Sequence, residues 1–225
     1  MKTLGWQHNA AGFPPFCSDR PVTTTRISIF PLTGAVLFPG LQLPLHIFEP
    51  RYRAMISDSL ARDRRIGMIQ PQKPVDGAPL YEIGCLGHIG EVEALEDGRF
   101  NIVLEGMVRF RILRELSVTT LFRQVEAELI DDPVDQSLSA VERAMFEREA
   151  RRFADALGYS VDWEQVTRLD DVALINGVSQ IAPFDAAAKQ ALLEADHVGE
   201  RCELLVQLMQ FFARRDGDEG RATMQ

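Results

Sequence analysis

The sequence has little cysteine, with three residues in 225, namely Cys17, Cys85 and Cys202. An odd number of widely spaced cysteines implies no disulfide framework and fits a reducing compartment. The sequence also lacks any apolar run approaching the ~20 residues that cross a bilayer. Its first residues, MKTLGWQHNAAG, do not contain the apolar core of a secretion signal. These absences predict a cytoplasmic protein with no membrane partner.

Basic side chains are scarce relative to acidic ones. Lysine and arginine together number 24 against 33 aspartate and glutamate residues, which gives a net charge of −9 and a pI of about 5.0. Proteins that bind nucleic acids or anionic membranes need a surplus of basic side chains to displace counterions. The charge balance therefore argues against nucleic acid as a partner.

Signatures of catalysis and of metal binding are absent from the sequence. It holds neither the phosphate loop GxxxxGK[ST] nor the nucleophile turn GxSxG. The four histidines are scattered, and none stands at a metal-ligand spacing such as CxxC or HExxH; they are His8, His46, His88 and His197. We therefore expect no enzyme activity, no cofactor and no metal. A stand-alone hydrolase stays open as an alternative, because serine and histidine residues do occur.

The most informative stretch runs from Ile27 to Pro71. Its prolines at positions 31, 39 and 44 interrupt short apolar runs, which predicts brief edge strands or extended segments. Pro50 suits the first position of a helix. After it, apolar residues recur at helical spacing on one face, and they are Tyr52, Met55, Ile56 and Leu60. This helix should stop near Asp63, before a short strand at 66–69.

From Arg26 to about Ile130 the dominant hydrophobic period is two, as in half-buried antiparallel strands. Asp97-Gly98 predicts a hairpin with a type I′ turn, and Gly106 predicts a bulge or a sharp bend. The clearest strand places alternate side chains on opposite faces. The inward set is Ile102, Leu104, Gly106, Val108, Phe110 and Ile112, and the outward set is Asn101, Glu105, Arg109 and Arg111.

After a break at Asp131-Asp132-Pro133 the pattern becomes helical. Helices are predicted to begin near 140, 163, 169, 186 and 197, and the last should end near Arg214. Pro183 prevents continuation of the helix at 169–181. The predicted capping residues are Ser139 with Glu142 as a capping box, Asp162, Asp185, and Gly158 as a C′ glycine.

Several motifs together resemble one family. FPL, VLFPG, LPLHIFEPRYRAMI and DRRIGMIQP occur in this order, IGCLGHIGEVEALEDGRFNIVLEGMVRFRI follows, and KQALLEADHVGERCELLVQLM lies near the end. The run is similar to the Lon substrate-binding (Lon N-terminal) domain family over roughly four-fifths of the chain. The resemblance implies a stand-alone, bacterial-type member without ATPase or peptidase modules, since the chain ends where those modules would begin.

The residues and the resemblance together predict an α+β fold. An irregular N-terminal arm is expected over 1–25, a β-rich subdomain with one early helix over 26–131, a helical-bundle subdomain over 132–214, and a disordered tail over 215–225. The resemblance implies that the β-rich subdomain is a PUA-like β-barrel.

The proline-rich stretch supplies the candidate binding site. Unpaired strand edges beside aromatic side chains suit an extended peptide that adds to a sheet. The candidate peptide-binding residues are Phe38, Pro39, Pro44, Phe48, Arg51 and Tyr52. Taken singly, Phe48 and Tyr52 also fit a core role that joins the helix to the strands.

Arg109 and Arg111 form a second candidate, an anion contact on the outward face of one strand. The favoured alternative is a solvated sheet face, with cross-strand partners such as Glu91 or Glu93.

The resemblance implies a non-catalytic module that binds unfolded polypeptide or a protein partner, with a link to protein quality control. An RNA-associated module is a second hypothesis, because PUA-like barrels also occur in RNA-binding proteins, although the acidic balance opposes it. The sequence leaves the identity of the ligand and the oligomeric state open.

Overall fold

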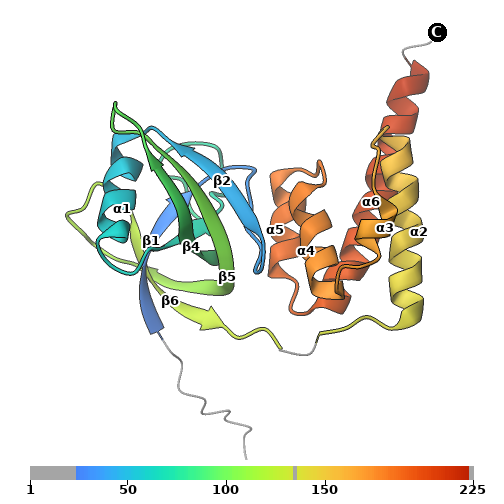
Figure 1. Ribbon diagram of the computed structural model, residues 1–225, viewed down its shortest axis with the longest axis horizontal. Helices are drawn as coiled ribbons and strands as arrows, with labels where there is room; N and C mark the ends of the chain where they lie inside the picture. Colours follow the sequence, from blue (N-terminus) through green and yellow to red (C-terminus); the bar gives the residue numbers. More distant parts are fainter. Residues whose placement is uncertain (1–23, 134–135, 223–225) are drawn as a thin grey trace, which may run out of the picture.

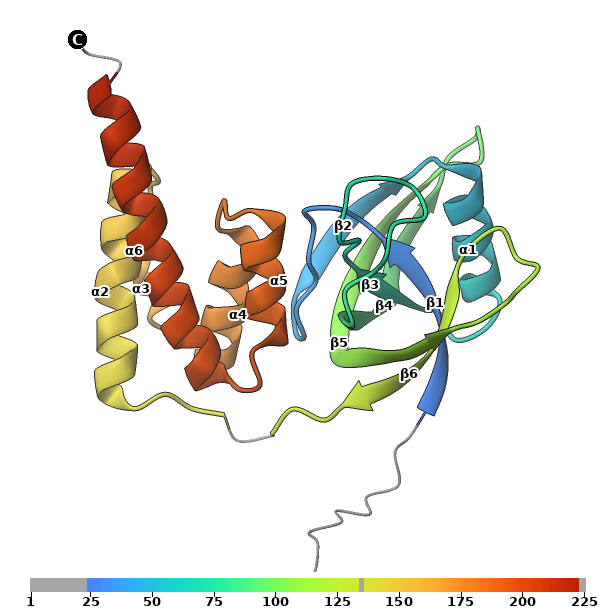
Figure 2. The ribbon, with the colours of Figure 1, turned by 180° about the vertical axis from the view of Figure 1, so that it is seen from behind.

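The chain folds into a sheet unit and a helical unit that lie side by side (Figure 1), and Figure 2 shows the same arrangement from behind. The structure is a computed structural model and describes residues 24–133 and 136–222. We call 24–133 the sheet unit and 136–222 the helical unit. Most of the predicted N-terminal arm, residues 1–23, lies outside the described residues, as do 223–225.

The elements follow the predicted order of strands first and helices later. The strands are β1 Thr24–Pro31, β2 Gln42–Ile47, β3 Arg65–Ile69, β4 Ile83–Ala94, β5 Phe100–Glu115 and β6 Gln124–Ile130. The helices are α1 Pro50–Leu60, α2 Ala140–Ala156, α3 Trp163–Val166, α4 Asp171–Ile181, α5 Ala186–Glu194 and α6 Val198–Ala222. All strands of the described part of the chain therefore precede the helical unit.

Helix α1 begins at Pro50, as its sequence predicts, with the proline at the first turn where a missing N–H costs nothing. It buries Tyr52, Met55 and Ile56 against the strands of the sheet unit. Helix α6 differs from the prediction, because it continues to Ala222 where a tail was expected from residue 215. Once a helix is nucleated, each added residue gains a hydrogen bond, so a charged segment can extend it.

The sheet has six strands in the order β2-β5-β4-β3-β1-β6, and β6 also pairs with β5. The first half of β5 pairs with β2 and its second half pairs with β6. The hydrogen-bonded pairs thus form a cycle of five strands, with β2 added outside it along β5. Strands β1 and β3 are parallel, and the other pairs are antiparallel.

The bulge predicted at Gly106 is confirmed. Leu86 pairs with Val108 while Gly87 pairs with Gly106, so Met107 is the extra residue of β5. A Cβ atom at position 106 would overlap the carbonyl oxygen of Phe38. The glycine therefore lets the loop at 38–41 lie directly on β5, where Gly106 N–H donates to the carbonyl of Leu41 at 2.7 Å.

The hairpin at Asp97-Gly98 is confirmed, but its predicted turn type is wrong. A type I′ turn needs positive φ at both central residues, and Arg64 is the only non-glycine with positive φ among the described residues. Gly98 has φ +79° and its N–H donates to the carbonyl of Leu95 at 2.9 Å. The glycine thus follows a turn centred on Glu96 and Asp97, as in a three-residue hairpin loop.

The helical unit starts at the predicted capping box, in which Ser139 and Glu142 each accept a hydrogen bond from the other's backbone N–H. Asp162 and Asp185 cap α3 and α5 as predicted, and Gly158 takes φ +72° after α2. None of the helices in the described ranges is both long and apolar enough to span a membrane.

The two units share one hydrophobic core. The cluster that holds α2, α4, α5 and α6 together also contains three buried side chains of the sheet unit, which are Val36, Phe38 and Ile83, and Leu41 and Ile130 pack against it. Two further clusters fill the inside of the sheet unit. The helical unit is therefore packed on the sheet unit through the loop that precedes β2 and through the start of β4.

Candidate functional site

The six predicted peptide-binding residues do not form one surface. Phe38 and Pro39 lie where the loop before β2 meets α4. Pro44 and Phe48 lie in and just after β2, which is the outer strand of the sheet. Arg51 and Tyr52 lie in the first turn of α1 and line a groove. The predicted set therefore divides into three places, each of which has a different environment.

Phe38 is fully buried, so its predicted role in a surface pocket is wrong. Its backbone N–H donates to the side chain of Gln180 at 3.2 Å, and Asn176 donates to the carbonyl of Pro39 at 3.1 Å. The guanidinium of Arg201 lies 5.7 Å from the centre of the Phe38 ring. Because α4 and α6 cover this loop, Phe38 holds the two units together and cannot reach a partner.

The outer edge of β2 offers little room for an added strand. Pro44 has no N–H, and the carbonyl of Gln42 already accepts from the side chain of Gln180 at 2.9 Å. Beyond them, Phe48 is exposed and lies against His46, with ring centres 6.2 Å apart. Prolines and occupied carbonyls are common ways to protect a sheet edge. The edge is therefore protected at Gln42 and Pro44.

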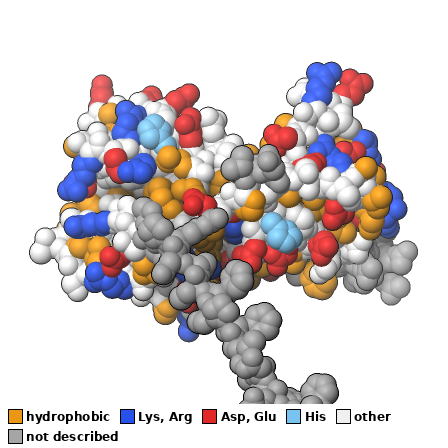
Figure 3. All heavy atoms as spheres, turned by 90° about the horizontal axis from the view of Figure 1, so that it is seen from below, with side chains coloured by type: hydrophobic (Ala, Val, Ile, Leu, Met, Phe, Trp, Pro, Cys, Tyr) orange, Lys and Arg blue, Asp and Glu red, His pale blue; other side chains and the backbone are white. Residues whose placement is uncertain are grey.

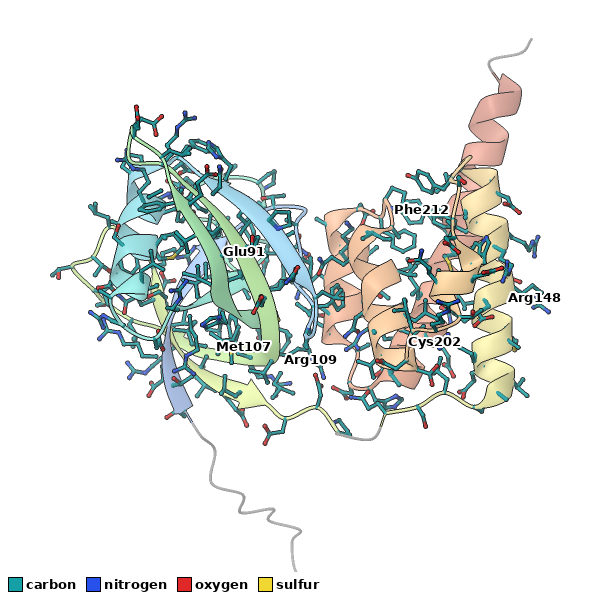
Figure 4. All side chains as sticks on the ribbon, viewed as in Figure 1. Glu91, Met107, Arg109, Arg148, Cys202 and Phe212 are labelled. Atoms are coloured by element: carbon teal, nitrogen blue, oxygen red, sulfur yellow. The ribbon has the colours of Figure 1, made fainter. Side chains whose placement is uncertain are left out.

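Arg109 is buried, so the predicted outward anion contact is wrong for this residue. Its side chain extends from β5 towards the helical unit, as Figure 4 shows. It donates to the carbonyls of Leu193, Ala195 and Asp196 at 2.9, 2.7 and 3.1 Å, and it pairs with Asp132 at 2.5 Å. The outward face of the strand is covered here by the end of α5, and the chain itself supplies the acceptors.

Arg111 remains exposed on β5, two residues further along. Its cross-strand neighbours are Ile83 and Glu128, and the predicted partners Glu91 and Glu93 lie elsewhere. Glu93 instead accepts a hydrogen bond from Asn101 at 2.7 Å. No described acidic side chain is paired with Arg111 in a salt bridge, so the anion contact stays a prediction at this position.

A groove at the start of α1, which we call the α1 groove, is the concave site that contains two of the predicted residues, Arg51 and Tyr52. It has a volume of about 280 Å³ and lies between the end of β1, the first turn of α1, the loop at 70–82 and the loop at 116–123. Its lining combines apolar and polar side chains, with slightly more apolar than polar surface, and includes two arginines. The residues are Pro31, Leu32, Thr33, Glu49, Arg51, Tyr52, Pro71, Pro74, Val75, Asp76, Gly77, Ala78, Leu121, Phe122 and Arg123.

The local sequence explains how the groove forms. Tyr52 is held in the floor by its ring contact with Phe30, whose centre lies 4.3 Å away. The loop at 70–82 is closed at its base by the bridge between Pro71 and Leu80, while residues 72–77 stay exposed. Prolines end strands and prevent regular pairing. The walls are therefore loops held at fixed points by a rigid helix and sheet.

Two arginines border the groove, and each has an acidic partner. Arg51 pairs with Asp76 at 2.5 Å and with Glu49 at 2.9 Å, and its guanidinium lies 4.7 Å from the Tyr52 ring centre. The hydrogen bond from Arg51 lowers the pKa of Asp76, and burial raises the pKa of Tyr52. Arg123 pairs with Glu115 at 2.7 Å and donates to the carbonyl of Ala78 at 3.3 Å.

The sequence patterns identified only part of this groove. Arg51 and Tyr52 were among the predicted residues, whereas Val75, Asp76, Leu121 and Arg123 were not. Pro71, Pro74 and Gly77 do mark a loop in the sequence. Their position beside α1 depends on the pairing of β3 with β1 and β4, which no local pattern specifies.

The groove lining carries hydroxyl groups on Thr33 and Tyr52 and carboxylates on Glu49 and Asp76. Its described lining residues include no serine, cysteine or histidine. Burial raises the pKa of Cys85 to about 12 and that of Cys202 to about 11, so both stay as unreactive thiols near neutral pH. Among the described residues no group of His, Cys, Asp and Glu side chains is placed to hold a metal ion.

Acidic and basic side chains are interspersed over both units on the face in Figure 3.

Comparison with known proteins identifies relatives of the whole described fold. Residues 26–210 match the ATP-dependent protease La (LON) substrate-binding domain. The chain is 28% identical over 196 residues to Lon protease 2 of Sorangium cellulosum, covering 81% of this chain and 24% of that protein. It is 27% identical over 191 residues to Lon protease 2 of Desulfotalea psychrophila, covering 80% and 24%. The chain thus spans about a quarter of the length of these relatives.

Two solved structures share the fold. A Lon N-terminal domain protein from Xanthomonas campestris aligns with a TM-score of 0.64 at 21% identity, covering 81% of this chain and 98% of that one. The N-terminal domain of a Mycobacterium avium complex Lon protease aligns with a TM-score of 0.61 at 22% identity, covering 83% and 98%. The predicted resemblance is confirmed, and so is the α+β class with a mixed sheet and helices.

Proposed function

The chain belongs to the ATP-dependent protease La (LON) substrate-binding domain family, and we propose that it recognises unfolded polypeptide without cleaving it. In this proposal it acts in protein quality control in the cytoplasm, where its cysteines Cys85 and Cys202 stay free. We take the cycle of five strands as the PUA-like β-barrel that the family resemblance implies. The helical unit then serves as the second subdomain that braces it.

We assign recognition to the α1 groove. Its volume of about 280 Å³ suits one or two side chains of an extended segment, since pockets for whole small molecules run to about 300–1,000 Å³. Leu121 and Val75 line it and are strongly exposed, so apolar surface is already open to a partner. Full burial of one large apolar side chain is worth about 1.5–3 kcal/mol.

One observation carries the proposal: an open groove with exposed apolar side chains stands on a rigid sheet unit, and its described lining has no serine, cysteine or histidine. Such a groove gains free energy from apolar side chains that a folded protein hides and an unfolded one exposes. Recognition of this kind needs no cofactor and no metal.

The test is binding of a reduced, carboxymethylated and fluorescently labelled protein, measured by anisotropy. Leu121→Asp places a charge at the groove rim, and we expect about tenfold weaker binding, the equivalent of 1.4 kcal/mol. Leu121 is 71% exposed, so the fold should survive the change, as thermal melting would show.

Ile181→Asp is the matched control, because Ile181 is 78% exposed at the end of α4 and outside the groove. This variant should bind as the unchanged protein does. Equal affinity of all three proteins, or equal loss in both variants, would remove the groove as the site. The labelled protein should also stay intact on a gel, and its cleavage would contradict a purely binding role.

A further inference from the structure

One carboxylate of the chain itself already lies at the groove and is paired with one of its two guanidinium groups. Asp76, at the tip of the loop at 70–82, pairs with Arg51 at 2.5 Å. Arg123 lines the same groove, and its charge adds to that of Arg51 in lowering the pKa of Asp76. The groove therefore combines apolar walls with a position at which an anionic carboxylate is stabilised.

The guanidinium of Arg51 binds two carboxylates, those of Glu49 and Asp76. Glu49 accepts from Nε at 3.0 Å and pairs with Nη2 at 2.9 Å, which fixes the orientation of the planar group. Asp76 takes only Nη1. Nη1 of the oriented Arg51 guanidinium thus donates to the carboxylate of Asp76, which belongs to an exposed loop.

Asp76 is easily replaced at this position. Its side chain is 81% exposed, and pairs between exposed charges contribute little to stability because water competes for both groups. The loop around it has its own hydrogen bonds, including Gln72 N–H to the carbonyl of Pro79 at 2.8 Å and Ala78 N–H to that of Val75 at 3.2 Å. Release of Asp76 would therefore leave the loop in place.

We propose that the α1 groove recognises the free C-terminal carboxylate of a polypeptide that ends in an apolar residue. The terminal carboxylate replaces Asp76 on Nη1 of Arg51, the charge of Arg123 attracts it, and the last side chain enters the apolar groove. Asp76 then acts as a competing internal carboxylate that keeps the site closed to weak ligands. The inference rests on the proposed function, because it names the part of a polypeptide that the groove binds.

The test uses two short labelled peptides with one sequence ending in leucine, one with a free terminal carboxylate and one with a terminal amide. A charge pair at a partly exposed guanidinium gives a modest gain, so the free acid should bind about three- to fivefold more tightly than the amide. Affinity is measured by fluorescence anisotropy with the full chain at low salt. The preference should shrink as salt is added, because exposed charges are screened.

Two variants change the preference in opposite directions. Arg51→Gln should bring the ratio of the two affinities close to one, whereas Asp76→Asn removes the competitor and should strengthen binding of the acid alone. Arg62→Gln is the control for the first, since Arg62 is an exposed arginine just after the same helix, paired with Asp58. Asp63→Asn is the control for the second, since Asp63 is an exposed carboxylate paired with Arg65.

The outcomes separate this inference from the proposed function. Equal binding of acid and amide, with a loss in Leu121→Asp, would overturn carboxylate recognition and leave polypeptide binding standing. Weaker binding of the acid by Asp76→Asn would also overturn it. If neither peptide binds, the inference fails, and the unfolded protein probe then decides the proposed function by itself.

Discussion

Arg109 joins β5 to the end of α5, and Arg51 joins α1 to the loop at 70–82, but the first arginine is buried and the second is partly exposed. Arg109 is 2% exposed and donates to three backbone carbonyls and one carboxylate. The side chain of Arg51 is 36% exposed, and one of its two partners is a loop carboxylate that is 81% exposed. The acceptors of the first arginine are buried groups of the fold, whereas the second pairs with exposed side chains, and we propose that one of them is exchanged for a ligand.

The difference follows from what each arginine satisfies. The carbonyls of Leu193 and Ala195 lie at the end of α5, where a helix leaves acceptors without internal partners. A cation there also suits the negative end of the helix dipole. Arg109 therefore stabilises the contact between the units, while the acceptors of Arg51 belong to surface side chains that water can solvate.

The largest effect is expected where the buried arginine is removed. Arg109→Ala leaves the carbonyls at the end of α5 and the carboxylate of Asp132 without their donor, and breaking a buried pair costs about 3–5 kcal/mol. Arg111→Ala, on the same strand but exposed, should change the free energy of unfolding by about 0.5 kcal/mol or less. Urea unfolding of both variants measures the difference, and equal losses would show that the interface does not depend on Arg109.

A smaller loss is expected at the backbone contact that seats Phe38. Gly106→Ala places a Cβ against the carbonyl oxygen of Phe38, and forced overpacking costs about 1–3 kcal/mol. Gly177→Ala is the control, since a Cβ there meets nothing within 4 Å, and in a helix interior it should add about 0.5–1 kcal/mol. Unfolding transitions that move in the same direction for both variants would contradict this account.

The parts of the structure that could be predicted from the sequence are those that local residues determine. The helix at Pro50, the capping box at Ser139 and the bulge at Gly106 depend on a few neighbouring residues, and all three are confirmed. Within the hairpin at 97–98, the position was predicted but not the turn type, because a glycine in left-handed conformation fits more than one loop length.

The environments of Phe38 and Arg109 could not be predicted in the same way. Phe38 donates to a residue 142 positions away, and Arg109 donates to carbonyls 84 and 86 positions away. The alternation of β5 indicates which face a side chain occupies, but it cannot indicate that another unit covers that face. For the same reason the sequence identified Arg51 and Tyr52 but missed the loops that complete the α1 groove.

A loss of stability smaller than at Arg109 or Gly106 is expected at Arg51, and it tests the comparison most directly. Arg51→Ala is the same substitution as Arg109→Ala, yet the contacts it removes are partly exposed, so the free energy of unfolding should fall by about 1 kcal/mol or less. Some of that loss comes from the arginine stem and its contact with the Tyr52 ring rather than from charge. The pair of variants is compared by urea unfolding at one pH and salt concentration. A loss at Arg51 as large as that at Arg109 would show that this arginine, too, is part of the fold. A small loss in stability together with weaker polypeptide binding would place Arg51 among the residues that the fold leaves available for a partner.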